Sequence, residues 1–333
     1  MISCVFVYPR ETHTEHGFFK AKGELSQKLL LNGIIELKPV KQIIGLTALC
    51  LIWGTTWQAI KISLEGIPPF TGAGIRFVIA SVFLFVIILL RRSSLYANKR
   101  EIWLLLLVAV LTYFIDYGLI YWGEKYLSAG VTAVFFATFP LFTAIFTNFV
   151  FKNEHFNWIK YLGLMIGFIG ISIVFLDQLL ITSFNTKILL SSSGIIIAAI
   201  SAAIATVLIK KHLTHINSFT LSLYQMAPGA FFLLSFGFLS ENLAAVQLST
   251  KVVLAVLYLA VIGSAVTFVI YYHLLKHMSA ITLSTIIYVT PIVALIADFL
   301  LFREVPPIRT LLGAGLIFLG IWTTQMRKKG ERR

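Results

Sequence analysis

The chain has 333 residues, of which 58% are hydrophobic and only 12% are charged, and its formal net charge is +13. Its mean hydropathy of +0.90 excludes a soluble globular domain and predicts an integral membrane protein. A nucleic-acid partner is not expected, because the Lys and Arg residues lie between apolar runs rather than on one basic face. The two cysteines, Cys4 and Cys50, predict neither a disulfide framework nor a metal site.

The first segment of the chain, residues 1–40, shows no persistent helical or strand period. It lacks the basic start and the compact apolar core of a signal peptide. We interpret it as a flexible N-terminal tail, and whether it belongs to the mature protein stays open.

Ten apolar runs follow, and their length is typical of helices that cross a bilayer. If the N-terminus is cytoplasmic, 17 Lys and Arg residues near the membrane fall on the inner side and six on the outer side. The positive-inside rule then predicts a multi-pass protein of the cell (plasma) membrane with both termini in the cytoplasm. The runs are 43–61, 70–90, 102–122, 128–149, 158–176, 189–209, 219–239, 252–272, 280–301 and 308–325.

The second half of the chain repeats the first. The stretch from Lys125 to Lys152 recurs 151 positions later, from Lys276 to Arg303, with Pro140 on Pro291. Lys61 and Arg76 pair with Lys210 and Gln225 at a shift of 149 positions. We therefore expect two five-helix repeats, 41–180 and 187–326, followed by a basic tail at 327–333. Because five is odd, the second repeat enters the membrane inverted, an arrangement that supports alternating access.

A proline stands in the middle of the fourth and of the ninth run, Pro140 and Pro291. Proline removes a backbone hydrogen bond, so each of these helices is expected to bend or break at mid-membrane. Interrupted helices at matching positions of two halves indicate the central site of a transporter. We therefore assign both prolines as helix hinges.

These features resemble one known family. The stretch LIWGTTWQAIKISLEGIPPFTGAGIRF, the fourth helix SAGVTAVFFATFPLFTAIF and the 5+5 repeat are similar to the EamA-type branch of the drug/metabolite transporter superfamily. The similarity covers about residues 43–325. The resemblance implies a ten-helix inner-membrane carrier for amino acids or related metabolites, commonly an exporter, and it does not choose one substrate.

Two charged side chains lie well inside the predicted spans, Arg76 and Asp116. A charge near the bilayer centre costs on the order of 2.5–3.5 kcal/mol even on lenient scales, so each needs a partner or a function. Both residues lie about 6 Å on the outer side of their helix centres if helices two and three run in opposite directions. We expect an ion pair or a shared polar cavity; a fixed structural pair and a proton-coupling role for Asp116 both stay open.

Asp116 belongs to a polar aromatic stripe on the third helix, with Tyr113, Tyr117, Tyr121 and Glu124 at helical spacing. Such a face is able to stack on an organic solute and hydrogen-bond to it. The equivalent face of the eighth helix carries Ser264, Thr267, Phe268, Tyr271 and Tyr272. We interpret Tyr121 and Tyr272, near helix ends, as interfacial anchors instead.

The ninth helix adds a polar face with Ser284, Thr285 and Tyr288, whereas the fourth offers Ala133 and Phe136. Together these faces predict a cavity between helices one, three, four, six, eight and nine, with aromatic walls and little charge. It suits amphipathic or zwitterionic solutes better than phosphorylated ones. The expected substrate-binding residues are Trp53, Tyr113, Asp116, Tyr117, Thr267, Tyr271 and Tyr288.

Two other patterns receive structural interpretations. Glycines in the fifth and tenth runs, with Gly163 and Gly320 among them, let helices approach closely, either within the chain or between two copies in a homodimer. His212 with His215, and His273 with His277, are expected at helix ends rather than at a metal.

The expected function is secondary active transport of small metabolites, with an amino-acid or related metabolite exporter as the first choice and proton coupling left open. A permease for a vitamin, nucleobase, sugar or drug, including uptake, is the alternative. A small-multidrug-type exchanger would need an acidic residue between Ile43 and Lys61, and there is none. A membrane enzyme would need clustered catalytic groups, and no nucleotide-binding motif or cofactor site is evident. The chain is expected to act as a monomer or homodimer.

Overall fold

The computed structural model describes residues 40–95, 98–151, 158–181, 185–290, 292–293 and 308–325. By its internal contacts the chain separates into two units, Met1–Gly45 and Leu46–Arg333. Residues 40–45 of the first unit are helical, and the account below concerns the second unit. The N-terminal tail up to residue 39, the hinge assigned to Pro291 and the basic tail lie outside the described residues.

Every regular element of the described residues is a helix. Four of them are continuous over the length of a span: Val40–Ser63, α2 (Pro69–Leu90), α9 (Thr186–His212) and α10 (Ser218–Ser240). The interrupted helices are α3 (Lys99–Ala109), η1 (Val110–Asp116) and α4 (Tyr117–Glu124); α5 (Ala129–Phe136) and α6 (Phe139–Val150); and α11 (Thr250–Ala260), η3 (Val261–Val266) and α12 (Thr267–His277). The shorter helices are α7 (Trp158–Val174), α8 (Leu176–Ile181), η2 (Leu243–Ala245), α13 (Ala280–Ser284) and α15 (Ile308–Gln325).

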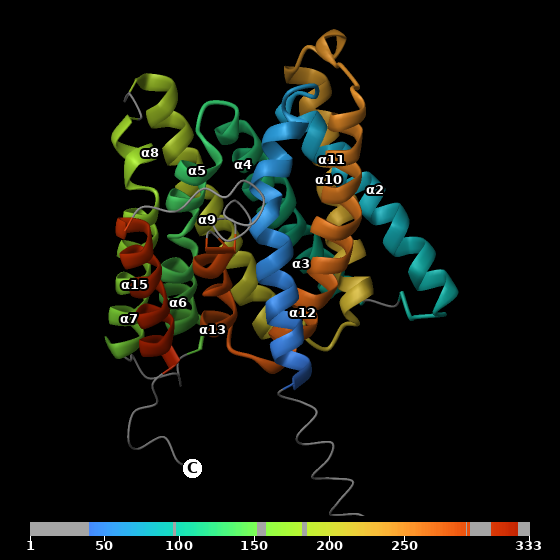
Figure 1. The fold of residues 1–333 in the computed structure, drawn as a ribbon. Helices are drawn as coiled ribbons and strands as arrows, with labels where there is room; N and C mark the ends of the chain where they lie inside the picture. The colour runs from blue at the N-terminus through green and yellow to red at the C-terminus, as the bar shows by residue number, and fades with distance from the viewer. Residues whose placement is uncertain are drawn as a thin grey trace, which may run out of the picture. The chain divides into compact units, whose positions relative to one another are not determined.

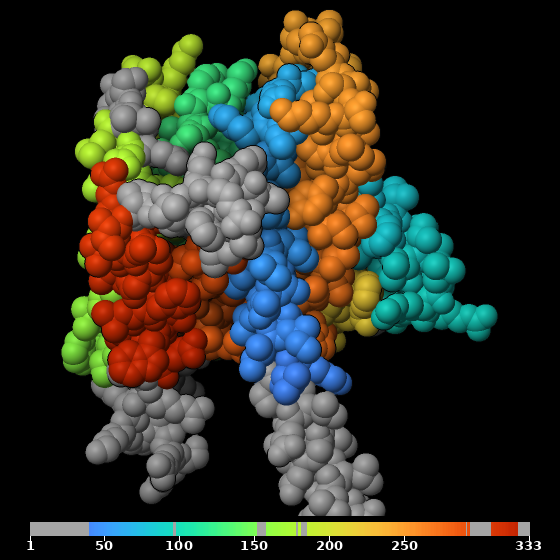
Figure 2. All heavy atoms as spheres, in the orientation of Figure 1, coloured from blue at the N-terminus to red at the C-terminus, as the bar shows by residue number. Residues whose placement is uncertain are grey.

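Seven helices in the described part have the length and apolar composition of a membrane span, counting interrupted helices as one each. Two shorter apolar helices, Trp158–Val174 and Ala280–Thr290, and α15 occupy three more of the expected runs. The expected run at 280–301 continues beyond the described residues, so the count of ten helices stays a prediction. Figure 2 shows the C-terminal part of α2 at the edge of the second unit, where Leu90 is 78% exposed, as expected for a lipid-facing side chain.

Repeat-equivalent helices run in opposite directions and pack on each other. In Figure 1 the chain rises from α3 to α4 and descends from α11 to α12. The second helix of the first half, α2, packs on α10, which is its equivalent in the second half, and α7 packs in the same way on α15. Glu241, just after α10, accepts hydrogen bonds from the backbone N–H groups of Phe70 and Thr71 and so caps the start of α2.

Glycines allow α7 and α15 to touch through their backbones. A Cβ atom added to Gly320 would lie 2.5 Å from Gly167 N and 2.6 Å from Gly163 O. A Cβ on Gly170 would lie 2.8 Å from Gly313 O. These glycines therefore serve packing within the chain, the first of the two interpretations drawn from their pattern.

Two lysines bind helix ends in equivalent ways in the two halves. Lys61 Nζ donates to the carbonyl oxygens of Glu124 and Leu127, at the end of α4 and just beyond it. Its repeat equivalent, Lys210, donates to the carbonyls of Leu275 and Lys276 at the end of α12. Each ammonium thus supplies donors to helix-terminal carbonyls that have no intrahelical partner.

The interruptions of the helices are only in part those expected from proline. The fourth span does break, at residues 137–138, and Pro140 lies in the first turn of α6, where its missing N–H costs no hydrogen bond. Two further interruptions carry no proline: the π-helical segments η1 and η3 begin at repeat-equivalent positions, Val110 and Val261. These two π-helical segments were not predicted from the sequence.

The glycine contact between α7 and α15 yields a matched pair of substitutions. Gly320→Ala should destabilise the protein by about 1–3 kcal/mol, because its new methyl group meets backbone atoms that cannot move aside easily. Gly315→Ala, in the same helix, has no heavy atom within 4 Å of its new Cβ and should leave stability unchanged or raise it by up to about 1 kcal/mol. Thermal unfolding of both variants in detergent measures the difference; equal melting would contradict the contact.

Candidate functional site

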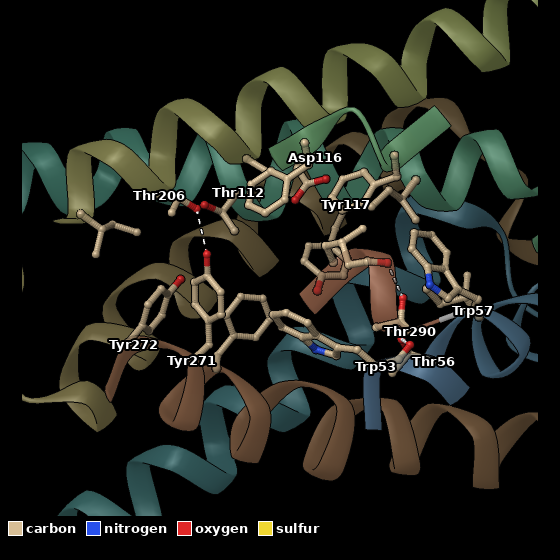
Figure 3. Close-up of a pocket in the computed structure, with 18 residues that line it drawn as sticks. Trp53, Thr56, Trp57, Thr112, Asp116, Tyr117, Thr206, Tyr271, Tyr272 and Thr290 are labelled. Atoms are coloured by element: carbon tan, nitrogen blue, oxygen red, sulfur yellow. Dashed lines mark hydrogen bonds between the residues drawn. The ribbon is translucent and has the colours of Figure 1, made fainter. Parts of the chain in front are cut away.

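A pocket lies among the helices of the second unit and has an empty volume of about 740 Å³, including space open to solvent. Its 18 lining residues come from helices one, three, four, six, eight and nine of the expected order, the six that were predicted to surround a cavity (Figure 3). They are Trp53, Thr56, Trp57, Ile60, Thr112, Asp116, Tyr117, Ile120, Phe136, Phe139, Ala202, Thr206, Ile209, Phe268, Tyr271, Tyr272, Ile287 and Thr290.

The pocket straddles the internal repeat. Fourteen of its 18 lining residues form seven pairs related by the shifts of 149 or 151 positions. The pairs are Trp53 with Ala202, Trp57 with Thr206, Ile60 with Ile209, Tyr117 with Phe268, Ile120 with Tyr271, Phe136 with Ile287 and Phe139 with Thr290. The two halves therefore contribute equivalent backbone positions but different side chains, so that the walls of the pocket are not symmetric.

Two buried polar atoms of the lining residues have no hydrogen-bond partner among the described residues. One is the acceptor Oδ1 of Asp116, and the other is the donor Nε1 of Trp53. Asp116 ends the π-helical segment η1 and is 3% exposed. Figure 3 draws the two side chains on opposite sides of the pocket in that view. A ligand carrying both a donor and an acceptor would satisfy both atoms.

The other polar groups of the pocket are mostly occupied. Tyr271 and Thr206 share a hydrogen bond of 3.2 Å between their hydroxyls (Figure 3). Thr56 and Thr290 donate to backbone carbonyls in their own helices. Trp53 packs its ring against those of Phe268 and Tyr271, with centroids 5.8 and 5.4 Å apart. The result is an aromatic wall with few free polar atoms.

Arg76 lies outside the pocket lining and does not pair with Asp116. Its Nε donates to Ser264 Oγ at 2.7 Å, and its Nη2 donates to the carbonyl of Gly263 at 3.1 Å, both in η3. Its Nη1 reaches Tyr121 OH at 3.4 Å, and its guanidinium lies 4.9 Å from the ring centre of Tyr117. The expected ion pair is not formed in this structure, because the π-helical turn of η3 offers Arg76 neutral acceptors instead.

The repeat equivalent of this arrangement is uncharged. Gln225 occupies the position of Arg76, and Tyr272 that of Tyr121. Tyr272 OH donates to Gln225 Oε1 at 3.0 Å and lies 3.4 Å from Tyr113 OH. The same scaffold therefore holds a cation in one half and an amide in the other.

Four of the seven expected binding residues line the pocket: Trp53, Asp116, Tyr117 and Tyr271. The other three do not. Tyr113 bonds to Tyr272, and Thr267 donates to the backbone carbonyl of Ser264. Tyr288 OH donates to the carbonyl of Leu164, and its ring lies against Gly167 of α7.

The interpretation of Tyr121 and Tyr272 as interfacial anchors is wrong. Tyr121 is 0% exposed and Tyr272 2% exposed, and their hydroxyls face Arg76 and Gln225. Position near a helix end suggested an interfacial role, but a buried polar partner on α2 or α10 satisfies each hydroxyl inside the protein.

The sequence analysis placed the sixth helix at the cavity but named none of its lining residues. Ala202, Thr206 and Ile209 line the pocket from α9. They carry no polar stripe that would have drawn attention. The repeat itself is the signal that would have found them, since they are the equivalents of Trp53, Trp57 and Ile60.

Helices long enough to span a membrane, a two-fold repeat and a pocket between its halves define a multi-pass membrane transporter fold. The model of the EamA-like transporter family matches the chain twice, at residues 40–176 and 189–325. The chain belongs to the EamA-like transporter family, whose members are membrane transporters of small solutes.

Curated relatives agree with this assignment. The chain is 29% identical over 283 residues to the uncharacterized transporter YoaV of Bacillus subtilis, covering 85% of this chain and 96% of that protein. It is 29% identical over 265 residues to the uncharacterized inner membrane transporter YedA of Escherichia coli, covering 76% of this chain and 80% of the relative. A solved crystal structure shares the fold with a TM-score of 0.72 at 16% identity, covering 86% of this chain and 96% of the other.

The contacts of Arg76 predict that lysine cannot replace it. Arg76→Lys should lower stability by about 1–3 kcal/mol, because one ammonium cannot reach Ser264, Gly263 and Tyr121 together. Arg100→Lys is the control: Arg100 is exposed, and its change should stay within about 0.5 kcal/mol. Thermal unfolding in detergent measures both, and an Arg76→Lys protein as stable as the control would show that the fork geometry is unimportant.

Proposed function

We propose that this protein is a secondary carrier that exports amino acids or related amino metabolites in exchange for protons. The observation that supports it best is the carboxyl of Asp116, which lines the pocket with one oxygen unpartnered among the described residues. A substrate ammonium group would supply the missing donor. The free Nε1 of Trp53 would donate to a carboxylate or carbonyl of the same solute.

Exchange follows if a proton and an ammonium compete for Asp116. When the substrate ammonium binds the carboxylate, Asp116 has released its proton to water; when the substrate leaves, the carboxyl takes up a proton again. An empty carrier with a bare carboxylate pays the cost of a buried charge, so it is held back from reorienting. The proton gradient would in this way drive export.

The walls of the pocket favour a substrate with an apolar or aromatic side chain. The first half provides the rings of Trp53 and Trp57 where the second half provides Ala202 and Thr206. An apolar substituent is therefore expected against the tryptophans. No Lys, Arg or His is among the 18 lining residues, which disfavours strongly anionic solutes.

A permease for another small organic solute, including uptake, is the second candidate. It is favoured by the predominance of apolar rings in the lining, since a neutral planar solute would stack there without needing Asp116. The two candidates differ in whether transport depends on this carboxyl.

The first test measures retention of radiolabelled amino acids and amines in cells with and without the protein. We expect at least one apolar or aromatic amino compound to be lost faster when the protein is present, and this loss should disappear when the proton gradient is collapsed. Loss that is unaffected by the gradient would contradict exchange with protons. A response confined to neutral vitamins, bases or sugars would favour the second candidate.

The substitution Asp116→Asn distinguishes the two candidate functions, because only one of them depends on this carboxyl. Loss of the charged hydrogen bond should reduce export of an amino substrate about ten- to a hundredfold, and what remains should no longer depend on the proton gradient. Glu65→Gln is the control, since Glu65 is exposed and pairs only with Lys251 in the described structure. Export in cells is the measurement. Unchanged, gradient-dependent export by Asp116→Asn would exclude the coupling role.

We also propose that the break before Pro140 acts as a hinge during alternating access; the same role for Pro291 stays a proposal from the sequence. Pro140→Ala should slow export while leaving the melting temperature near that of the original protein, because alanine lets α5 and α6 fuse into one straighter helix. Pro228→Ala, inside α10 and outside the pocket lining, is the matched control. Full export by Pro140→Ala would argue against a hinge at this position.

A further inference from the structure

A second acidic residue is buried in the same helix, outside the pocket. Glu124 ends α4 and is 0% exposed. Neither of its carboxylate oxygens has a hydrogen-bond partner among the described residues. A carboxylate in this condition carries a large cost of desolvation, and a structural role in packing would be met more cheaply by an apolar residue.

The surroundings of Glu124 contain two cations. The ionic neighbours of its carboxyl are Lys61, on the first helix, and Arg76, on α2, and Tyr121 is its neighbour on α4. From α9, the apolar Ile195 and the backbone of Ser191 approach the adjacent Gly123, and α5 has no titratable residue. The ammonium of Lys61 is therefore the group most able to change partners, because Arg76 is held by Ser264, Gly263 and Tyr121.

Lys61 lies beside Glu124 and contacts both solvent and the end of α4. Its side chain is exposed overall, whereas its Nζ donates to the carbonyls of Glu124 and Leu127. The ammonium thus holds the first helix against the end of α4 while standing next to an acid that it does not bond. A shift of Lys61 from these carbonyls to the carboxylate would alter that attachment.

The repeat provides an internal comparison. Lys210 binds the carbonyls at the end of α12 in the same way, but the residue equivalent to Glu124 is Leu275. The lysine contact with a helix end therefore forms in a half where the equivalent of Glu124 is apolar. The presence of Glu124 in one half alone points to a function that the architecture does not require.

We propose that Glu124 is a proton-binding site, distinct from the pocket, whose protonation controls the attachment of Lys61 to the end of α4. With a proton bound, Glu124 is neutral and Lys61 stays on the two backbone carbonyls, as seen here. When the proton leaves to water, the carboxylate attracts the ammonium of Lys61 and the carbonyls lose it. The O–H bond of the carboxyl is the only covalent bond broken, and water receives the proton; the hydrogen bonds from Lys61 to the two carbonyls are exchanged for its contact with the carboxylate.

This site is separate from Asp116. The two acids are eight residues apart, which corresponds to about 12 Å along a helix. Asp116 lines the pocket and Glu124 does not. The role in transport rests on the proposed carrier function, whereas proton binding by Glu124 is testable without any substrate.

The test uses infrared difference spectroscopy of the full-length protein in lipid during a pH titration. A protonated carboxyl has a C=O stretching band that disappears when the proton leaves. Glu124→Gln should remove one such band, which should persist in Asp116→Asn and in Glu65→Gln. In Lys61→Met the Glu124 band should persist to higher pH, because a neighbouring positive charge that favours the carboxylate is gone. Lys210→Met, the repeat equivalent, should leave that band unchanged.

The outcomes are distinguishable. A Glu124 band that titrates and responds to Lys61→Met but not to Lys210→Met supports the proposal, whatever solute is carried. Spectra of Glu124→Gln identical to those of the original protein overturn it, as does a Glu124 band insensitive to Lys61. Melting in detergent verifies that each variant is folded. If an exported solute has been found, export by Glu124→Gln that keeps its original pH dependence overturns the link to transport, even where the proposed function holds.

Discussion

The side chain of Arg76 brings a permanent charge into the middle of the helices, and several features of the structure accommodate it. An arginine at this depth must have acceptors for its donors, since no water replaces them in an apolar interior. The π-helical segment η3 supplies a backbone carbonyl at Gly263 and the hydroxyl of Ser264, and Tyr121 and the ring of Tyr117 complete the enclosure. Because Gly263 and Ser264 belong to the second half and Arg76 to the first, these two contacts also tie the halves together.

The two halves share positions and differ in charge. Equivalent residues line the pocket, and equivalent lysines bind the ends of α4 and α12. The charged members Arg76, Asp116 and Glu124 have the uncharged equivalents Gln225, Thr267 and Leu275. A repeat of this kind gives two similar ways of packing, as alternating access needs. Of the three charged residues only Asp116 lines the pocket, and it makes the two sides of the pocket chemically different.

Much of the architecture could be predicted because it depends on patterns that the sequence displays directly. Apolar runs set the helices, and the shared prolines and lysines revealed the repeat. The helices that line the cavity were then predicted from the apolar runs and the repeat together. The π-helical segments could not be predicted, because no proline or glycine cluster separates them from ordinary helix; they form where a side chain from another helix, such as Arg76 or Ser201, takes a backbone carbonyl. Tyr113 and Tyr288 lie outside the pocket for a similar reason, because each hydroxyl hydrogen-bonds to a residue of another helix.

The expected ion pair between Arg76 and Asp116 shows most clearly that depth in the membrane alone does not predict which side chains meet. Arg76 and Asp116 were matched in depth and opposite in charge, which favoured an ion pair. A helix, however, also has a rotational position, and the face of α2 that carries Arg76 meets η3 rather than Asp116. The acid is thereby left facing a pocket with an unpartnered oxygen. A permanent salt bridge would have neutralised this carboxyl and removed it from any exchange with solute or proton. The separation of the two charges is therefore what leaves Asp116 available for the role in transport that we propose for it.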